Sequence, residues 1–435
     1  MSDVRTAFRK TQTRGAEDSG RMTFPLPYSP FDAALRTDPY PAFDSARAAG
    51  AYRLPSWQGG QWILTRYRDV RALIASNHFL VDDLPGQLES KAAAAQGVRV
   101  ERLVRNLRSW LFFRDPPEHG AMRKLLQQRF SAARLAGLRE TIGSEARDLL
   151  AAADEDAPFD VIGDYAHRLP GRVMRRILGM PADRLEELTA WSTDLFKVLV
   201  PPQSLPTYAR LDATTAAFED YFTALMALKK TDPGDDVITD LAADGVDPGT
   251  ALGLAVMLFS VGQDTTENLI GNAVLALLRY PDQLEILRED PSLLGAAVDE
   301  AARFDTPVQG IARTCARSVV VGDETISAGE RTIFMLAAAN RDPEQFEDPD
   351  AFVIGRTVRS MLPFGGGAHF CLGAHLARLI AEEALGALIE HAPEMRLADQ
   401  PLRWKNIILL RALTALPVRF EKTGVSGPAR LVSAP

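Results

Sequence analysis

Residues 364–378, FGGGAHFCLGAHLAR, constrain the fold of this chain more than any other segment. Three glycines precede Cys371, one of only two cysteines among 435 residues, and a helical pattern follows it directly. The unpaired N–H groups and positive end of a helix favour a thiolate by about 0.3–1 kcal/mol at exposed sites. Because that contribution is small, a bound metal must supply most of the deprotonation. The loop therefore predicts a lone thiolate that binds a metal at the start of a helix.

Other kinds of site are compatible with this spacing. A buried structural cysteine in a glycine-rich loop is the ordinary alternative. Zinc is a second, because His369, Cys371 and His375 form an H-x-C-x3-H cluster, although structural zinc normally has four ligands. Iron in a porphyrin needs only one strong axial ligand from the protein. It also explains the glycines, including Gly367 and Gly373, since a backbone without Cβ atoms can approach a flat macrocycle closely.

Composition narrows the class of protein. A chain that is 46% hydrophobic and 24% charged predicts a globular, enzyme-sized protein with a large core. The net charge of −8 argues against a nucleic-acid partner, which would require an extended basic surface. Residues 1–22 lack an apolar segment, so we expect a disordered leader there, a flexible tail over 423–435, no membrane anchor and a cytoplasmic location. Both cysteines are then expected to be thiols.

The segment 251–278 is long and apolar, as a membrane span would be. Its middle carries Asp264 and Glu267 together with three amides, and ionised carboxylates are costly at the centre of a bilayer. The sequence therefore predicts a buried helix through a large core.

Helical periodicity prevails from residue 115 to 278, whereas short β-branched runs occur at 51–64, 308–335 and 395–420. No repeat, P-loop or dinucleotide fingerprint is present. These patterns predict a mainly α protein with small β-sheets (α+β).

A known family carries the same cysteine motif. Phe364, Gly367, His369, Cys371 and Gly373 match F-x-x-G-x-H-x-C-x-G, which resembles the haem-binding signature of the cytochrome P-450 monooxygenases, and the likeness to bacterial members continues over most of the chain. The resemblance implies one large triangular helical domain, residues 23–422, with a long central helix over the haem. It also implies haem b (iron protoporphyrin IX) as cofactor, the cysteine as its proximal thiolate ligand, and the other four residues as haem contacts.

The segment GQDTTEN lies midway along the long apolar stretch. Such polar residues often only bond to their own helix backbone. By resemblance, Asp264 and Thr265 lie on the distal side of the haem and deliver the protons used in oxygen activation, while Thr266 has no such role. Gly262 is expected to leave room at the cofactor.

Glu300 and Arg303 are three residues apart, a spacing that usually gives a weak, solvated ion pair. The resemblance implies instead that this pair is buried and structural. Many relatives complete it with an arginine where this chain has Ala351. Whether Arg356 or another group takes that place stays open at this stage.

Four basic residues are expected at the haem propionates. His119 and Arg123 are four residues apart and share one helix face. By resemblance they bind the propionates together with Arg313 and His369, because buried carboxylates need charge-assisted partners. Taken singly, each is as well explained as an exposed charge.

These residues predict a haem-thiolate monooxygenase that inserts one atom of O2 into a hydrophobic or amphipathic small molecule, by hydroxylation or epoxidation, in secondary-metabolite tailoring. Because the chain shows no flavin or iron–sulfur segment, electrons are expected from a separate ferredoxin and an NAD(P)H-dependent ferredoxin reductase. A peroxygenase, a coupling or rearrangement enzyme, and a non-enzymatic haem sensor are the alternatives. The resemblance assigns the substrate pocket to Leu258, Phe259, Val261, Val308, Ile311, Ile408 and Leu409.

Overall fold

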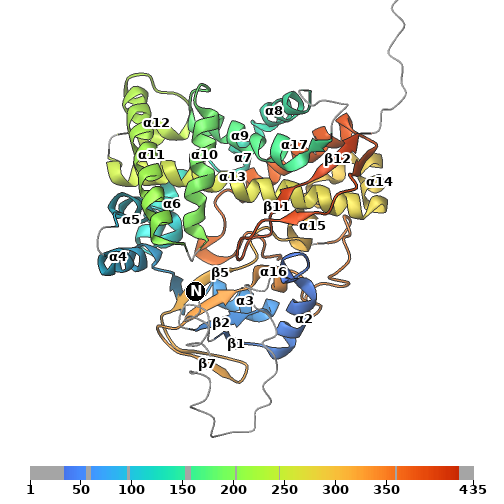
Figure 1. The fold of residues 1–435 in the computed structure, drawn as a ribbon, viewed down its shortest axis with the longest axis horizontal. Helices are drawn as coiled ribbons and strands as arrows, with labels where there is room; N and C mark the ends of the chain where they lie inside the picture. Colours follow the sequence, from blue (N-terminus) through green and yellow to red (C-terminus); the bar gives the residue numbers. More distant parts are fainter. Residues whose placement is uncertain are drawn as a thin grey trace, which may run out of the picture.

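A computed structural model describes residues 34–54, 60–95, 98–151, 158–200, 203–243, 245–357 and 360–420. The expected leader and tail lie outside these residues, as do both ends of the expected domain 23–422. Helices fill the upper part of the molecule in Figure 1, and a small sheet with helices α2 and α3 lies below them. The predicted class, mainly helical with small sheets, is confirmed.

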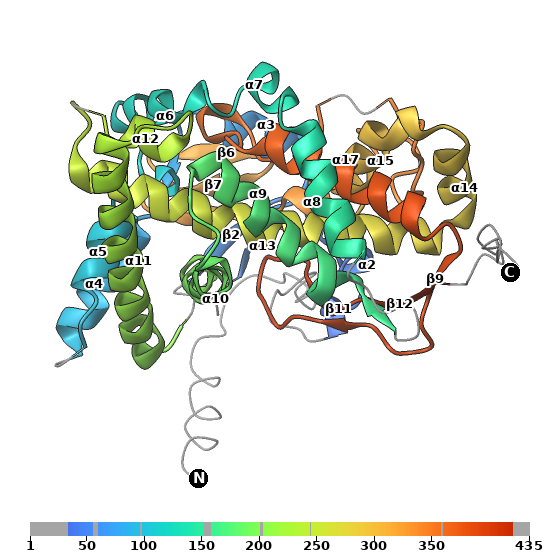
Figure 2. The same ribbon diagram turned by 90° about the horizontal axis from the view of Figure 1, so that it is seen from above.

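One long helix organises the helical part. Helix α13, Pro248–Arg279, has 32 residues and crosses the molecule in Figures 1 and 2. The Asp247 side chain accepts a hydrogen bond from the Thr250 amide at 2.8 Å, and Pro248 occupies the first turn, so the helix begins with a strong start signal. Most of its residues are buried on all sides, which is why its sequence lacks an exposed polar stripe.

The helices packed against α13 are α5 (Glu101–Leu107), α9 (Arg168–Leu178), α10 (Leu185–Phe196), α11 (Leu205–Thr231), α12 (Val237–Leu241), α14 (Pro281–Glu289), α15 (Leu294–Phe304) and α17 (Ala374–His391). A π-helical turn, Val161–Ala166, precedes α9. Shorter or more peripheral helices are α2 (Tyr40–Ala49), α3 (Tyr67–Ile74), α4 (Leu84–Ala94), α6 (Glu118–Gln127), α7 (Ala132–Ala136), α8 (Arg139–Ala151) and α16 (Leu336–Ala339).

The main sheet joins strands from distant parts of the chain. Its order is β1-β2-β8-β5-β3, formed by Tyr52–Leu54, Gln61–Leu64, Arg331–Phe334, Ile311–Cys315 and Phe79–Val81. Strands β2 and β8 run parallel, and the other pairs are antiparallel. The short runs that the sequence showed at 51–64 therefore form β1 and β2, at one edge of a sheet that β8, β5 and β3 complete.

Small sheets complete the fold, as the sequence predicted for residues 308–335 and 395–420. Strands β6 (Val319–Val321) and β7 (Glu324–Ile326) form a hairpin. The others are β4 (Phe159–Asp160), β12 (Pro417–Phe420) and β9 (Met395–Leu397) in one sheet, and β10 (Arg403–Trp404) with β11 (Leu413–Ala415) in another.

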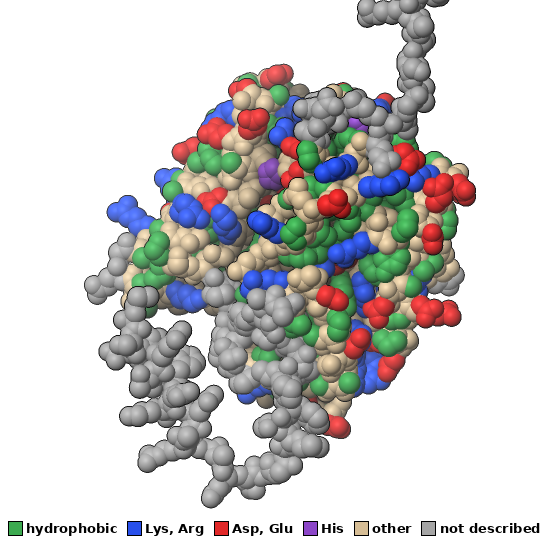
Figure 3. All heavy atoms as spheres, turned by 45° about the vertical axis from the view of Figure 1, so that its right-hand side comes forward, with side chains coloured by type: hydrophobic (Ala, Val, Ile, Leu, Met, Phe, Trp, Pro, Cys, Tyr) green, Lys and Arg blue, Asp and Glu red, His purple; other side chains and the backbone are tan. Residues whose placement is uncertain are grey.

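The surface carries charges of both signs. In Figure 3, Lys and Arg side chains are interspersed with Asp and Glu over the visible face formed by described residues. Over the described ranges, none of the helices combines the length and apolarity required to cross a bilayer. The prediction that α13 is a core helix agrees with this finding.

Candidate active site

The cysteine loop is held against α3. Gly367 has φ +64°, and a Cβ there would lie 2.7 Å from the Cα of Ala75. A Cβ at Gly366 would lie 2.9 Å from Ile74 Cγ2. The sequence suggested that these glycines make room for a macrocycle. In the structure, Gly366 and Gly367 have another reason, because they allow the loop to approach the end of α3. Gly365 and Gly373 have no heavy atom within 4 Å of an added Cβ, which leaves open space for a flat group.

Backbone hydrogen bonds fix Cys371 at the end of the loop. Its amide donates to the Phe364 carbonyl oxygen at 3.0 Å, and the Phe370 amide donates to that of Gly367 at 3.1 Å. Helix α17 then starts at Ala374, three residues after the cysteine. Cys371 is thus positioned close to a helix start, as predicted.

The environment of the Cys371 side chain opposes its ionisation. The side chain is accessible and unpaired, yet burial by surrounding protein raises the pKa of its thiol, an effect that the Gly373 amide and Arg123 oppose. The net rise in pKa means that a thiolate here depends on a bound metal cation.

Two of the alternatives for this cysteine are not supported. The described part of the chain contains no cluster of three His, Cys, Asp or Glu side chains suited to a metal ion, so the zinc cluster does not form. A buried structural role does not fit Cys371, whose side chain is exposed, but it fits Cys315. Cys315 is buried in β5, and its thiol donates to the Arg317 carbonyl oxygen at 3.2 Å.

Four basic side chains gather near the loop. The rings of His119 (α6) and His369 lie 4.1 Å apart between centroids, and the Nε2 atom of each is buried without a hydrogen-bond partner. Burial is the main reason why the pKa of His369 is lowered to about 3. The neighbouring Arg313 (in β5), His119 and Arg123 (one turn after His119) lower it further. Burial lowers the pKa of Arg313 to about 10.

This cluster lacks the anions that it needs. Among the described residues, neither Arg123 nor Arg313 has a carboxylate within ion-pair distance, and Asp115 approaches only His369, at 3.9 Å. Two arginines without a carboxylate partner, beside two buried imidazole nitrogens without a hydrogen-bond partner, favour an anionic ligand. Two carboxylates beside a flat group with one axial thiolate position would satisfy all four, so these residues fit a haem.

The predicted acid and alcohol lie on α13 as expected. Asp264 is buried, and its Oδ2 has no partner. The Thr265 hydroxyl is partly exposed and donates to the Val261 carbonyl oxygen at 3.2 Å. Thr266 is buried and donates to that of Gly262 at 3.0 Å. The partial exposure of Thr265, against the burial of Thr266, agrees with the choice between these two threonines.

Gly262 has a packing explanation of its own. A Cβ there would lie 3.1 Å from Met174 Sδ in α9. The absence of a side chain therefore allows α9 to approach α13 closely. The expected role at the cofactor stays a prediction.

Burial, and next the charge of Glu267, raise the pKa of Asp264 to about 6. We predict that Asp264→Asn increases the free energy of unfolding by about 3 kcal/mol at pH 8, because an unpaired buried charge is removed. The native pKa lies above the unfolded value, so this gain is full above pH 6 and disappears as the pH falls toward 4. Denaturant unfolding at both pH values checks this, with Asp220→Asn, at an exposed position on α11, as a control that should change little at either.

Glu300 and Arg303 form a buried bidentate pair, with both distances 2.8 Å and both side chains at 0% exposure. Arg303 also donates to carbonyl oxygens of Asn340, Pro349 and Ala351 at 2.9–3.0 Å.

The third member of the Glu300–Arg303 cluster is Arg356. The Arg356 Nε donates to Glu300 Oε1 at 3.1 Å, so Arg356 supplies the cation that Ala351 cannot. Ala351 contributes only its carbonyl oxygen, which accepts from both arginines.

The expected pocket residues divide into two groups. Val261, Val308, Ile311, Ile408 and Leu409 are all partly exposed. The Gln309 amide donates to the Leu409 carbonyl oxygen at 2.8 Å, which holds the segments around 308 and 409 side by side.

Two residues on α13 behave differently from the rest of the expected pocket. Leu258 is buried in the main core. Phe259 is wrong as a pocket residue: it has 0% exposure and packs edge-on against Phe218 of α11. Position 259 lies on the α11 side of α13, and periodicity alone did not reveal this.

Sequence reasoning missed the partners of Glu267. This carboxylate accepts hydrogen bonds from His167 and Lys405, and both lie far from it in the chain. The only signal in the sequence was a second acid one turn after Asp264.

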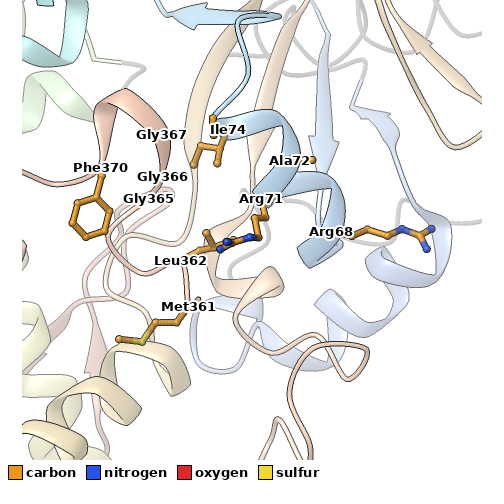
Figure 4. Close-up of a pocket in the computed structure, with 11 residues that line it drawn as sticks. Arg68, Arg71, Ala72, Ile74, Met361, Leu362, Gly365, Gly366, Gly367 and Phe370 are labelled. Carbon is orange, nitrogen blue, oxygen red and sulfur yellow. The ribbon is translucent and has the colours of Figure 1, made fainter. Parts of the chain in front are cut away.

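A hollow of about 500 Å³ lies on the outer side of the cysteine loop. Figure 4 shows Phe370 and the three glycines from the loop on one side and helix α3 on the other. Arg68 and Arg71 of α3, which are exposed, also line it. The hollow therefore combines cationic side chains with an exposed aromatic ring next to the cysteine.

Comparisons with known proteins agree with this site. The family model described as cytochrome P-450 matches residues 250–392. Cytochrome P-450 107B1 of Saccharopolyspora erythraea is 37% identical, over 89% of this chain and 96% of its own length. Vitamin D(3) 25-hydroxylase of Pseudonocardia autotrophica is 35% identical, over 89% and 95%. The solved structure of the monooxygenase TamI with tirandamycin C bound has a TM-score of 0.78 and 33% identity, over 90% of this chain and 99% of that one.

Proposed function

Since this chain belongs to the cytochrome P-450 family and is a haem-thiolate monooxygenase, we propose that Cys371 is its iron ligand. We further propose that it oxygenates a hydrophobic or amphipathic small molecule of secondary metabolism. The single observation that carries this proposal is the accessible, unpaired thiol of Cys371 in a loop beside His119, Arg123, Arg313 and His369, of which the two arginines have no carboxylate partner among the described residues.

The haem, when bound, supplies the activation of O2 and the insertion of one of its oxygen atoms into a C–H or C=C bond. His119, Arg123, Arg313 and His369 would hold its two carboxylates. Phe364 and Gly373 of the cysteine loop would lie beside the ring.

The acid and alcohol on α13 have the properties that proton delivery requires. Asp264 has a pKa of about 6, so it can both give up and regain a proton near neutral pH. Thr265 presents a partly exposed hydroxyl one residue further. We assign proton transfer to this pair, with Asp264 as the donor and Thr265 as the group that positions the proton.

The substrate class follows from the side chains around the segments near 308 and 409. Val261, Val308, Ile311, Ile408 and Leu409 present apolar surface that is not fully covered by protein, as pockets for hydrophobic ligands do. The relatives named for vitamin D(3) and solved with tirandamycin C are in keeping with a bulky, largely apolar substrate. Hydroxylation and epoxidation are the reactions assigned to it.

Electrons are proposed to come from a ferredoxin and its NAD(P)H-dependent reductase. The hollow beside the cysteine loop presents Arg68, Arg71 and the exposed ring of Phe370, which suit an acidic electron-transfer protein. Docking there would bring the donor next to the loop that holds the cysteine.

Turnover with surrogate ferredoxin and reductase under labelled O2 tests this function, after a screen for compounds that change the ferric spin state. One labelled oxygen atom in the product is expected. We predict that Thr265→Ala lowers product per electron about tenfold and diverts the electrons to peroxide, since positioned proton transfer typically contributes about 10²–10⁴-fold.

Thr266→Ala is the matched control, because its buried hydroxyl only bonds to the Gly262 carbonyl oxygen. Unlabelled product, or equal coupling in both threonine variants, would contradict the proposed function. Product formed only with added peroxide would identify a peroxygenase.

A further inference from the structure

A buried carboxylate lies one helical turn beyond Asp264. Glu267 is 2% exposed, and each of its oxygens has a cationic partner: Oε2 lies 2.7 Å from His167 Nδ1, and Oε1 lies 2.7 Å from Lys405 Nζ. The three residues come from α13, from the junction between the π-helical turn and α9, and from the residue after β10. Three separate elements thus meet at this one side chain.

This cluster connects the inside of the molecule with the solvent. Glu267 is enclosed, but the side chains of His167 and Lys405 are 35% and 28% exposed. Of these two cations, only histidine exchanges protons readily near neutral pH. His167 is therefore the group through which a proton from solvent can reach this part of α13.

Asp264 is a buried acid without a full set of partners on the same face of α13 as Glu267. Its Oδ2 is buried and without a hydrogen bond, and residues three apart on a helix lie on the same face. The charged groups that act on Asp264 are Glu267, Lys405 and His167. These three groups therefore influence the pKa of Asp264, and two of them, His167 and Lys405, are also in contact with solvent.

The charges around His167 and Asp264 favour proton exchange between these two side chains. The hydrogen bond to Glu267 raises the pKa of His167, and burial raises the pKa of Asp264 to about 6. His167 and Lys405 lower the pKa of Glu267 despite its burial, so it stays anionic. A cationic histidine beside a carboxyl group that titrates near neutrality allows proton transfer with little change in free energy.

We propose that His167, held by Glu267 and Lys405, resupplies Asp264 with protons from solvent. This inference rests on the proposed role of Asp264 in proton delivery. For each proton that Asp264 delivers, the imidazolium gives one proton to the Asp264 carboxylate, and the neutral imidazole then takes one from solvent. Glu267 and Lys405 are positioning residues: Glu267 orients the ring and keeps it cationic, and Lys405 holds Glu267 in place.

The first experiment does not depend on turnover. Histidine ring signals are titrated by NMR in the diamagnetic, reduced and CO-bound holoenzyme, and His167→Gln identifies the signal. We expect His167 to titrate above the ordinary histidine pKa of about 6.5, and Glu267→Gln to lower its pKa measurably. An ordinary pKa that is indifferent to Glu267→Gln would overturn the proposal.

The second experiment measures product per electron against pH. Coupling in the natural protein should fall as the pH rises through the His167 pKa measured by NMR, because the imidazolium is then lost. In His167→Gln we expect coupling about threefold to tenfold lower at neutral pH and no such fall with pH. Lys405→Gln should shift the fall toward higher pH, because the neighbouring cation lowers the pKa of His167. His391→Gln, at the exposed end of α17, is the matched control.

Asp264→Asn separates the two proposals. If Asp264→Asn loses coupling while His167→Gln keeps both its coupling and its pH dependence, protons reach Asp264 by another route and this inference fails. If neither variant loses coupling, the proposed role of Asp264 fails with it. A purely structural role of His167 would change stability without removing the pH dependence of coupling.

Discussion

Replacing Cys371 with serine will abolish oxygen insertion and remove the spectrum typical of a thiolate-ligated haem–CO complex. The serine hydroxyl fits the loop, but it does not provide the electron-rich sulfur that favours cleavage of the O–O bond. Optical spectra of the reduced, CO-bound protein and a labelled-oxygen assay on the same sample measure both effects.

Cys315→Ser is the matched control for this substitution. It removes the other sulfur of the chain, from a buried position in β5, so it should cost some stability but leave the spectrum unchanged. A thiolate-type spectrum in the Cys371 variant would show that the iron ligand lies elsewhere.

Arg303→Met will cost about 3–5 kcal/mol of unfolding free energy, because it leaves the Glu300 carboxylate charged in a fully enclosed site. Five hydrogen bonds of Arg303 are lost with it, two to Glu300 and three to backbone carbonyl oxygens. Denaturant unfolding of the holoenzyme measures the loss.

Two further variants place this loss on a scale. Arg356→Met should cost less than Arg303→Met, because Arg356 is partly exposed and shares only one oxygen of Glu300. Arg378→Met removes the partner of Asp299, the neighbouring acid on α15, from a partly exposed pair. That loss should stay near or below about 1 kcal/mol. Equal losses in the Arg303 and Arg378 variants would contradict a special role of the buried pair.

Local signals predicted the fold class well. The apolar run around Asp264 and the β-branched runs near residue 311 indicate how their own segments are buried. This works because burial on all sides or on one face determines the pattern of apolar residues along a segment. The cysteine motif is equally local. For these segments the sequence is a direct record of the structure.

Contacts between distant segments could not be read in this way. Nothing near Phe259 indicates that α11 covers its side of α13. Likewise, Arg356 could not be chosen over other basic residues as the partner of Glu300, because a turn of the chain rather than helical spacing brings it there. His167 and Lys405 meet Glu267 across three elements. Such partners are fixed by tertiary packing, to which a single sequence gives no local clue.

The seating of the cysteine loop on α3 has a consequence for biosynthesis. Gly367 packs against Ala75, and the sheet beneath α3 pairs β2 with β8, which leaves the ribosome much later. The platform that receives the loop is therefore unfinished until most of the polypeptide has been translated. Haem binding by this protein is then expected late, after β8 and the cysteine loop have both been translated, and truncated chains that end before β8 should not retain pigment.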